Sequence, residues 1–137
     1  MRPAAAQAAL MSGRKPGDRR VAEGARGESL ARQWLEGRSF VVLAARWRCR
    51  MGELDLIARE GGTIVFVEVR SRRSDRSGRP EESVGPQKRR RIARLAALWL
   101  AGQPRPVRDA PCRFDVIAVT GERIEHIRGA FEGSGAA

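Results

Sequence analysis

The sequence predicts an α/β fold in which helices flank a mixed central sheet of about five strands. The predicted elements follow the order helix, three strands, helix, two strands, which is typical of helices packed on a sheet. The run "TIVFVEVR" at residues 63–70 is β-branched and aromatic without polar alternation, as expected of a strand buried on both faces. Gly61 and Gly62 precede this run and predict a tight hairpin. The chain therefore places its most buried strand directly after a hairpin turn.

The first half of the chain contains one helix and three strands. Ala31, Trp34 and Leu35 recur at helical spacing, and Gly37 provides a C-terminal stop. The predicted bounds are 24–37 for the helix and 39–45, 52–58 and 63–70 for the strands.

The second half begins with a polar loop over residues 71–86, rich in Gly, Pro and Ser. A helix over 87–102 follows, with Ile92, Leu95 and Trp99 in its apolar stripe. Two further strands are predicted at 112–121 and 123–127.

Length and composition predict one domain without a membrane span. A chain of 137 residues suits a single domain, which we place at 21–132, after a disordered basic extension at 1–20 and before a loose tail at 133–137. No apolar run approaches the ~20 residues of a membrane span. Cys49 and Cys112 are isolated and there is one histidine, which argues against a zinc site and favours a reducing, cytoplasmic location.

The charge of the chain predicts a polyanionic partner. There are 27 Lys and Arg against 16 Asp and Glu, a net charge of +11. Nucleic acid is the commonest partner of such a surface, although an Arg-rich composition alone gives the same balance.

Three acids interrupt the best predicted strands of this basic chain. Glu53 and Asp55 lie in one strand and Glu68 in the next. A two-residue turn at Gly61-Gly62 would put Asp55 opposite Glu68, and a four-residue loop would put Glu53 there instead. Both registers place all three acids on one face of the sheet.

Carboxylates this close repel one another unless a cation lies between them. The cation could be Mg²⁺ or an arginine, and the repulsion alone leaves both open. The spacing favours a metal, because a carboxylate, a short hairpin and then Glu-x-basic is typical of metal-dependent phosphodiesterases. Arg70 shares the face of Glu68 and could hold a phosphate. Glu28 lies on the margin of the first helix, and Lys88 lies one turn before Ile92, so both could face the site.

The segments "GARGESLARQWL", "RWRCRMGELDLIA", "TIVFVEVRSR", "VGPQKRRRIARLAALWL" and "RFDVIAV" resemble, in this order, the YraN family of uncharacterised bacterial proteins. That family is similar to the restriction-endonuclease-like PD-(D/E)xK nucleases and to archaeal Holliday-junction resolvases. The resemblance implies a mixed sheet flanked by helices and a Mg²⁺ or Mn²⁺ site. It also implies an endonuclease-like protein acting on DNA, including branched or damaged DNA in repair.

The same resemblance assigns roles residue by residue. Asp55 and Glu68 match the metal-binding acids, and Glu28 matches a helix glutamate of the resolvase branch. Arg70 stands where the motif has lysine, and an arginine cannot release its proton. If the motif lysine only stabilises charge, Arg70 could serve in its place; if it acts as a base, Lys88 could replace it. The alternative is a binding module that cleaves weakly or not at all. Glu53 belongs to the family's own signature, and we expect it to pair with an arginine.

Basic residues flank the acids and are the predicted contacts to nucleic acid. They are Arg46, Arg48, Arg50, Arg70, Arg72, Arg73, Lys88 and Arg89. An adaptor that binds RNA or a protein remains an alternative, and a homodimer is suggested only by analogy with resolvases. Asp115 lies in the middle of a predicted strand, and we interpret it as structural.

Overall fold

The computed structural model describes residues 16–74 and 78–133, with side chains from Gly24 onward. Helix α2 (Pro16–Glu36) starts eight residues before the predicted helix and inside the expected N-terminal extension. Proline is tolerated at a first helical turn, but glycines at 24 and 27 weaken the helical signal, which explains the late predicted start. The remaining residues of that extension, 1–15, lie outside the described residues.

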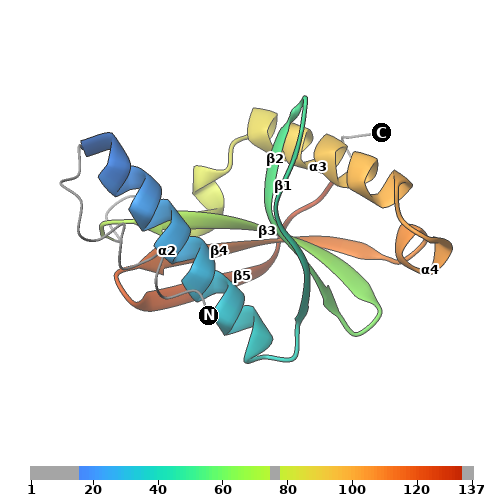
Figure 1. Cartoon of the computed structure of the whole chain (residues 1–137), viewed down its shortest axis with the longest axis horizontal. Coiled ribbons are helices and arrows are strands. Elements are labelled where there is room, and N and C mark those ends of the chain that lie inside the picture. The colour runs from blue at the N-terminus through green and yellow to red at the C-terminus, as the bar shows by residue number, and fades with distance from the viewer. Residues whose placement is uncertain (1–15, 75–77, 134–137) are drawn as a thin grey trace.

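The five strands form one mixed sheet, as predicted (Figure 1). Their order in the sheet is their order in the sequence, β1 to β5. The pair β3–β4 is parallel and the other pairs are antiparallel. The strands are β1 (Val41–Cys49), β2 (Gly52–Glu60), β3 (Thr63–Arg72), β4 (Cys112–Thr120) and β5 (Arg123–Phe131).

The parallel pair requires a crossover, which is provided by the 3₁₀ helix η2 (Pro80–Ser83), helix α3 (Pro86–Ala101) and the short helix α4 (Arg105–Arg108). Within the described chain, α3 begins with Pro86 after Gly85 and ends before Gly102, a residue arrangement that favours a helix start and stop.

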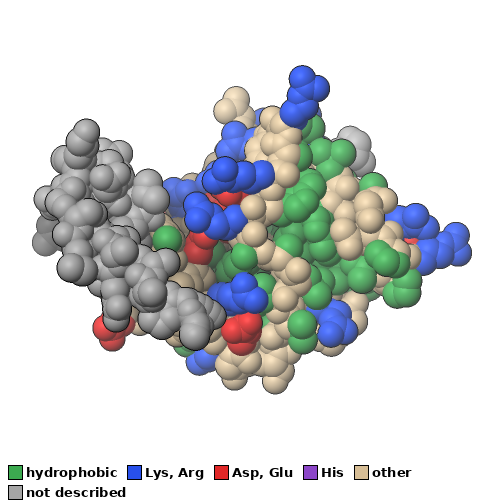
Figure 2. Space-filling view, viewed as in Figure 1, with side chains coloured by type: hydrophobic (Ala, Val, Ile, Leu, Met, Phe, Trp, Pro, Cys, Tyr) green, Lys and Arg blue, Asp and Glu red, His purple; other side chains and the backbone are tan. Residues whose placement is uncertain are grey.

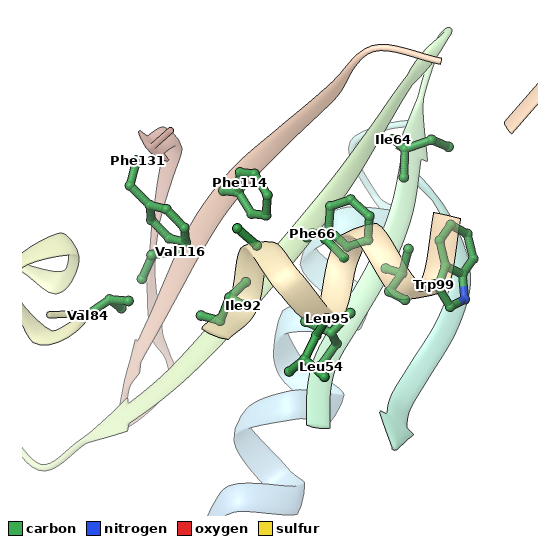
Figure 3. Packing of buried hydrophobic residues seen from close by; sticks show 13 residues of the cluster. Leu54, Ile64, Phe66, Val84, Ile92, Leu95, Trp99, Phe114, Val116 and Phe131 are labelled. Carbon is green, nitrogen blue, oxygen red and sulfur yellow. The ribbon is translucent and has the colours of Figure 1, made fainter. Parts of the chain in front are cut away.

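The sheet has a separate apolar core on each face. On the α3 face, Phe66 of β3 packs against Trp99 of α3 and stacks on Phe114, which in turn stacks on Phe131 (Figure 3). On the α2 face, Ala31 and Leu35 of α2 cover buried residues of β2, β3 and β4. Residues 64–68 of β3 are all buried because the strand lies between both cores.

The turn between β2 and β3 confirms the two-residue hairpin. Glu60 pairs with Thr63 and Leu56 with Val67, so Gly61 and Gly62 form the turn. Gly61 has φ 58°, a left-handed conformation that glycine adopts without strain.

Four strands run past their predicted ends, β2 and β3 by two residues and two others by four. β1 continues to Cys49 and β5 to Phe131. Each contains one residue with positive φ, Arg46 (φ 53°) and Gly129 (φ 62°), and each pairing contains a register shift. Such irregularities break the apolar alternation from which strand length is inferred.

Asp115 is fully buried on the α2 side of β4 and is structural, as interpreted from the sequence. It accepts hydrogen bonds from Arg113 Nε (2.8 Å) and Nη2 (3.0 Å) and from the Gly129 amide (2.9 Å). His126 Nε2 lies 2.8 Å from its Oδ2. Trp34 Nε1 donates to His126 Nδ1 at 3.3 Å, so Nε2 carries the proton and donates to Asp115. Burial alone would raise the pKa of Asp115, but the bonds from His126, Arg113 and Gly129 lower it to about 2.

Replacing this acid should destabilise the whole fold. Asp115→Ala leaves the donors of Arg113, His126 and Gly129 without their acceptor, so we expect the free energy of unfolding to fall by about 3 kcal/mol or more. Urea unfolding at pH 7 measures this loss. The control is Asp109→Ala, which removes an exposed acid in an i,i+4 pair and should change stability by less than about 0.5 kcal/mol. Equal losses in the two variants would contradict the structural role.

Candidate functional site

The candidate site lies where β2 and β3 separate. Their backbone pairing ends at Leu56 and Val67. Just beyond this point, Asp55 Oδ2 accepts a hydrogen bond from the Val69 amide at 2.8 Å. This bond satisfies a backbone donor of β3 that β2 no longer pairs with. The aspartate therefore closes the backbone hydrogen bonding of β3 at the point where its neighbour leaves it.

The strand β2 is also irregular at Asp55. Regular alternation would put Leu54 and Leu56 on one face, but Leu54 packs in the α3-side core and Leu56 in the α2-side core. On the neighbouring strand, Arg46 with its positive φ lies between the paired residues Ala45 and Trp47. We expected the three acids to share one face of a regular sheet. Instead, β2 twists locally at Asp55, and the Asp55 carboxylate reaches the backbone of β3.

Asp55 and Glu68 form the carboxylate pair predicted from the hairpin. The pKa of Asp55 is raised to about 7, because burial and then the neighbouring charge of Glu68 raise it more than the hydrogen bond from the Val69 amide lowers it. Glu28 adds a smaller repulsion, and the protonated Asp55 hydrogen bonds to Glu68. At neutral pH the pair therefore retains a proton for part of the time, and a cation would take its place favourably.

Lys88 supplies a cation to this pair from α3. Its Nζ lies 2.5 Å from Glu68 Oε2, and Glu68 is 8% exposed. Ile92, one turn further along α3, is buried in the core and fixes this face of the helix toward β3. Arg70 Nη1 is 3.8 Å from the same oxygen. The structure thus places Lys88, predicted from helical spacing, closer to Glu68 than Arg70, which occupies the motif position.

Glu28 and Glu53 meet on one arginine. Arg46 Nε lies 3.4 Å from Glu28 Oε1 and 3.8 Å from Glu53 Oε2. Glu53 also accepts a hydrogen bond from Arg48 Nε at 2.9 Å, in agreement with the prediction that it pairs with an arginine. Burial is the largest influence on Glu28 and raises its pKa, Arg46 opposes this, and the charges of Glu53 and Glu68 add to the rise.

Two carboxylates fit a hard divalent cation better than three do here. Among residues 16–74 and 78–133, no group of three or more His, Cys, Asp or Glu side chains is arranged to hold a metal. Mg²⁺ is usually bound by one or two carboxylates, with waters and substrate phosphates as its other ligands. Asp55 and Glu68 meet that requirement, and Glu28 stands near them as part of the electrostatic surroundings.

The basic residues predicted to contact nucleic acid fall into two groups. Arg48, Arg50 and Arg73 are exposed, and Figure 2 shows Lys and Arg side chains gathered around acidic ones between α2 and the β1–β2 hairpin. Arg72 instead donates to the Gly78 carbonyl at 2.6 Å, and Arg89 donates to Val84 O at 2.7 Å and Glu81 O at 3.2 Å. These two guanidinium groups hold the loop before α3.

Sequence reasoning missed Arg26, which lies beside Gly27 on α2. A Cβ atom at Gly27 would lie 2.1 Å from Ser71 Oγ and 3.5 Å from Ser71 Cβ, so the helix packs against β3 here and a larger residue would require the Ser71 hydroxyl to rotate. A glycine inside a helix can indicate such an approach, and this was the available signal.

The fold and this arrangement define an α/β protein with a mixed five-stranded sheet and an acidic centre bordered by Lys and Arg. Residues 27–119 match the family described as "Uncharacterised protein family UPF0102", and the chain belongs to that family. This confirms the resemblance to YraN-like proteins.

Relatives cover most of the chain. A UPF0102 protein of Anaeromyxobacter dehalogenans is 49% identical over 123 residues, 87% of this chain and 90% of its own. One from Geotalea uraniireducens is 46% identical, covering 80% of this chain and 88% of its own. A UPF0102 protein of Mycolicibacterium vanbaalenii is 48% identical, and the match covers 77% of this chain and 90% of its own. None of the helices in the described residues has the length and apolarity of a membrane span.

The raised pKa of Asp55 predicts a pH-dependent loss of stability. Its pKa rises from 3.8 to about 7 on folding, so the folded state binds the proton more tightly, and stability falls as pH rises between these values. Asp55→Asn cannot ionise. When the pH is raised from 5 to 8, we expect the unfolding free energy of Asp55→Asn to increase by about 2 kcal/mol relative to that of the wild type.

Urea unfolding at both pH values, in buffer with EDTA, measures this difference. The exposed Asp109→Asn serves as the matched control. A difference between Asp55→Asn and wild type that is the same at pH 5 and pH 8 would show that Asp55 has an ordinary pKa.

Proposed function

We propose that this protein cleaves phosphodiester bonds in nucleic acid, with DNA as the substrate, and that it depends on Mg²⁺ or Mn²⁺. The observation that carries the proposal is the contact of two carboxylates, Asp55 and Glu68, with Lys88 and Arg70 beside Glu68. Acids that bind a divalent ion and cations that bind phosphate are the groups that phosphodiester hydrolysis requires.

Asp55 and Glu68 would hold the ion. A bound divalent cation supplies Lewis-acid chemistry, polarising the phosphoryl oxygen and lowering the pKa of bound water. The Val69 amide keeps Asp55 oriented, since its bond to Oδ2 leaves Oδ1 available as a ligand.

Lys88 and Arg70 would act on the phosphate. In the absence of a metal, Lys88 neutralises Glu68. When Glu68 serves as a ligand instead, the ammonium group of Lys88 becomes available to donate to a phosphate oxygen or to hold the attacking water. Arg70 retains its charge at every accessible pH and can stabilise the phosphate, but it cannot serve as a base.

The surrounding charge would bring the substrate to this centre. The net charge of +11 and the exposed Arg48, Arg50 and Arg73 attract the phosphate backbone without sequence preference. DNA repair on branched or damaged substrates is the role we assign to such a nuclease, in line with the expectation from the sequence.

A second candidate is a nucleic-acid-binding module that does not cleave. Arg70 at the motif position favours it, as does the ion pairing that already neutralises Glu68. Binding without hydrolysis would use the same basic surface.

Cleavage of supercoiled plasmid and of a synthetic four-way junction, with Mn²⁺ or Mg²⁺, tests the first proposal. Losing a metal ligand removes several kcal/mol of transition-state stabilisation, so Glu68→Gln should reduce the rate about 100-fold or more. Lys88→Met should also reduce it about 100-fold, as expected for one donor to the developing charge. Glu36→Gln, which changes an exposed acid whose ion-pair partner among the described side chains is Arg32, is the matched control and should cleave like wild type.

Cleavage that survives Glu68→Gln at the wild-type rate would remove the proposed centre. Salt-sensitive DNA binding by a wild type that cleaves neither substrate with either metal would support the non-cleaving module instead.

A further inference from the structure

A small basic pocket opens beside the carboxyl end of β3, on the α2 side of the sheet. Its volume is about 260 Å³. Three arginines line it, together with small residues, and those used below are Arg26, Gly27, Ser71, Arg72, Arg73 and Gly121.

The close approach of α2 to β3 builds this pocket. Gly27 allows the helix backbone to reach Ser71, because a Cβ atom there would lie 2.1 Å from Ser71 Oγ. Arg26 Nη1 donates to the Gly121 carbonyl at 3.0 Å, so this guanidinium is anchored at one edge of the pocket. Arginine has five donors, so this contact leaves others that can bind a ligand as far as the described side chains go.

The charge in the pocket favours an anion. None of its described lining residues is an Asp or a Glu, so the pocket is basic. The guanidinium of Arg72 is already engaged, because it donates to the Gly78 carbonyl at 2.6 Å and lies 3.9 Å from Glu125, so the proposed anion site rests on Arg26 and Arg73. Arg73 is exposed and has no ion-pair partner among the described side chains. Arginine in this arrangement suits bidentate recognition of phosphate.

The size of the pocket restricts the ligand. Sites for whole small molecules usually occupy about 300–1,000 Å³. At 260 Å³ this pocket accommodates a phosphate and part of its sugar, rather than a nucleobase or a complete cofactor.

The pocket lies next to the candidate metal centre but on the other side of β3. Gly27 precedes Glu28, and Ser71 follows Arg70. Strand alternation places Arg70 with Glu68 on the α3 side and Ser71 on the α2 side. A nucleic acid strand that crosses the end of β3 would therefore meet Lys88 and Arg70 first and the pocket next.

We propose that this pocket binds a backbone phosphate of the nucleic acid strand beyond the linkage that is cut. The identity of the ligand rests on the proposed function, because nucleic acid is the substrate there. The pocket would hold the strand in register while Lys88 and Arg70 contact the scissile phosphate.

The test measures DNA binding without metal, so it does not depend on cleavage. The probe is a fluorescein-labelled 20-base-pair duplex in EDTA, followed by anisotropy over a series of KCl concentrations. We expect Arg26→Ala/Arg73→Ala to bind about 10-fold more weakly and to lower the slope of log K against log[salt] by about 1, the value for one phosphate contact.

A matched control removes the same charge elsewhere. Arg105→Ala/Arg108→Ala takes two arginines from α4, where both pair with the exposed Asp109, and should leave the salt slope unchanged. Should the double pocket variant fail to fold by circular dichroism, Arg73→Ala alone gives the same comparison with a smaller effect, because its exposed side chain lacks a partner in the described part of the chain.

The outcomes separate this proposal from the proposed function. A pocket variant that behaves like the α4 control, in a protein whose cleavage depends on Glu68, overturns the pocket alone. A reduced slope in the pocket variant, with cleavage unaffected by Glu68→Gln, supports the pocket and removes the nuclease. A wild type that does not bind the duplex overturns the pocket. Tight binding only to duplexes with a 5′-phosphate would overturn the assignment to a backbone phosphate.

Discussion

The hydrogen bond from the Val69 amide to Asp55 is the interaction on which the candidate site depends. It lets β2 leave β3 after Leu56 and Val67 without an unsatisfied backbone donor. The separation brings the Asp55 carboxylate to Glu68, and the two are held in a partly buried environment where neither disperses its charge into water.

The acids of the candidate site have cations as neighbours that come from different parts of the chain. Lys88 reaches the site from α3, Arg70 from β3 itself, and Arg46 joins Glu28 and Glu53 on the far side. Burying like charges together is costly, so a protein keeps such a group only where a partner or a ligand compensates for it. Glu28, Glu53 and Glu68 have side-chain partners here. Asp55 instead relies on a proton and a backbone amide, which makes it the acid most ready to receive a metal.

Much of this arrangement could be predicted from the sequence because it depends on short-range rules. The two-residue turn at Gly61-Gly62 was one of the two hairpin registers considered, and the 3.6-residue period of α3 placed Lys88 on the side of Glu68. The unbroken apolar run before Glu68 identified the central strand. Each of these signals lies within one or two neighbouring elements.

The features that were not predicted depend on irregular backbone conformations and on contacts between residues far apart in the sequence. Neither the periodicity nor the composition of a sequence predicts these. The positive φ of Arg46 and the twist of β2 at Asp55 leave no trace in alternation patterns. Arg72 and Arg89 were predicted as exposed phosphate contacts, yet loop carbonyls in the folded chain take up part of their donors. Arg26 joined the basic surface only because α2 packs closely on β3.

The most direct measurement of the central claim is calorimetric titration of Mn²⁺ at pH 8, into wild type and into Asp55→Asn/Glu68→Gln. The account predicts one site in the wild type and none in the double variant, with Asp109→Asn binding like wild type because its altered acid is on exposed α4 surface. Equal binding by the wild type and the double variant would show that the ion is held elsewhere. The absence of binding by both would mean that these acids do not hold a metal, because Lys88 and the retained proton of Asp55 neutralise them instead.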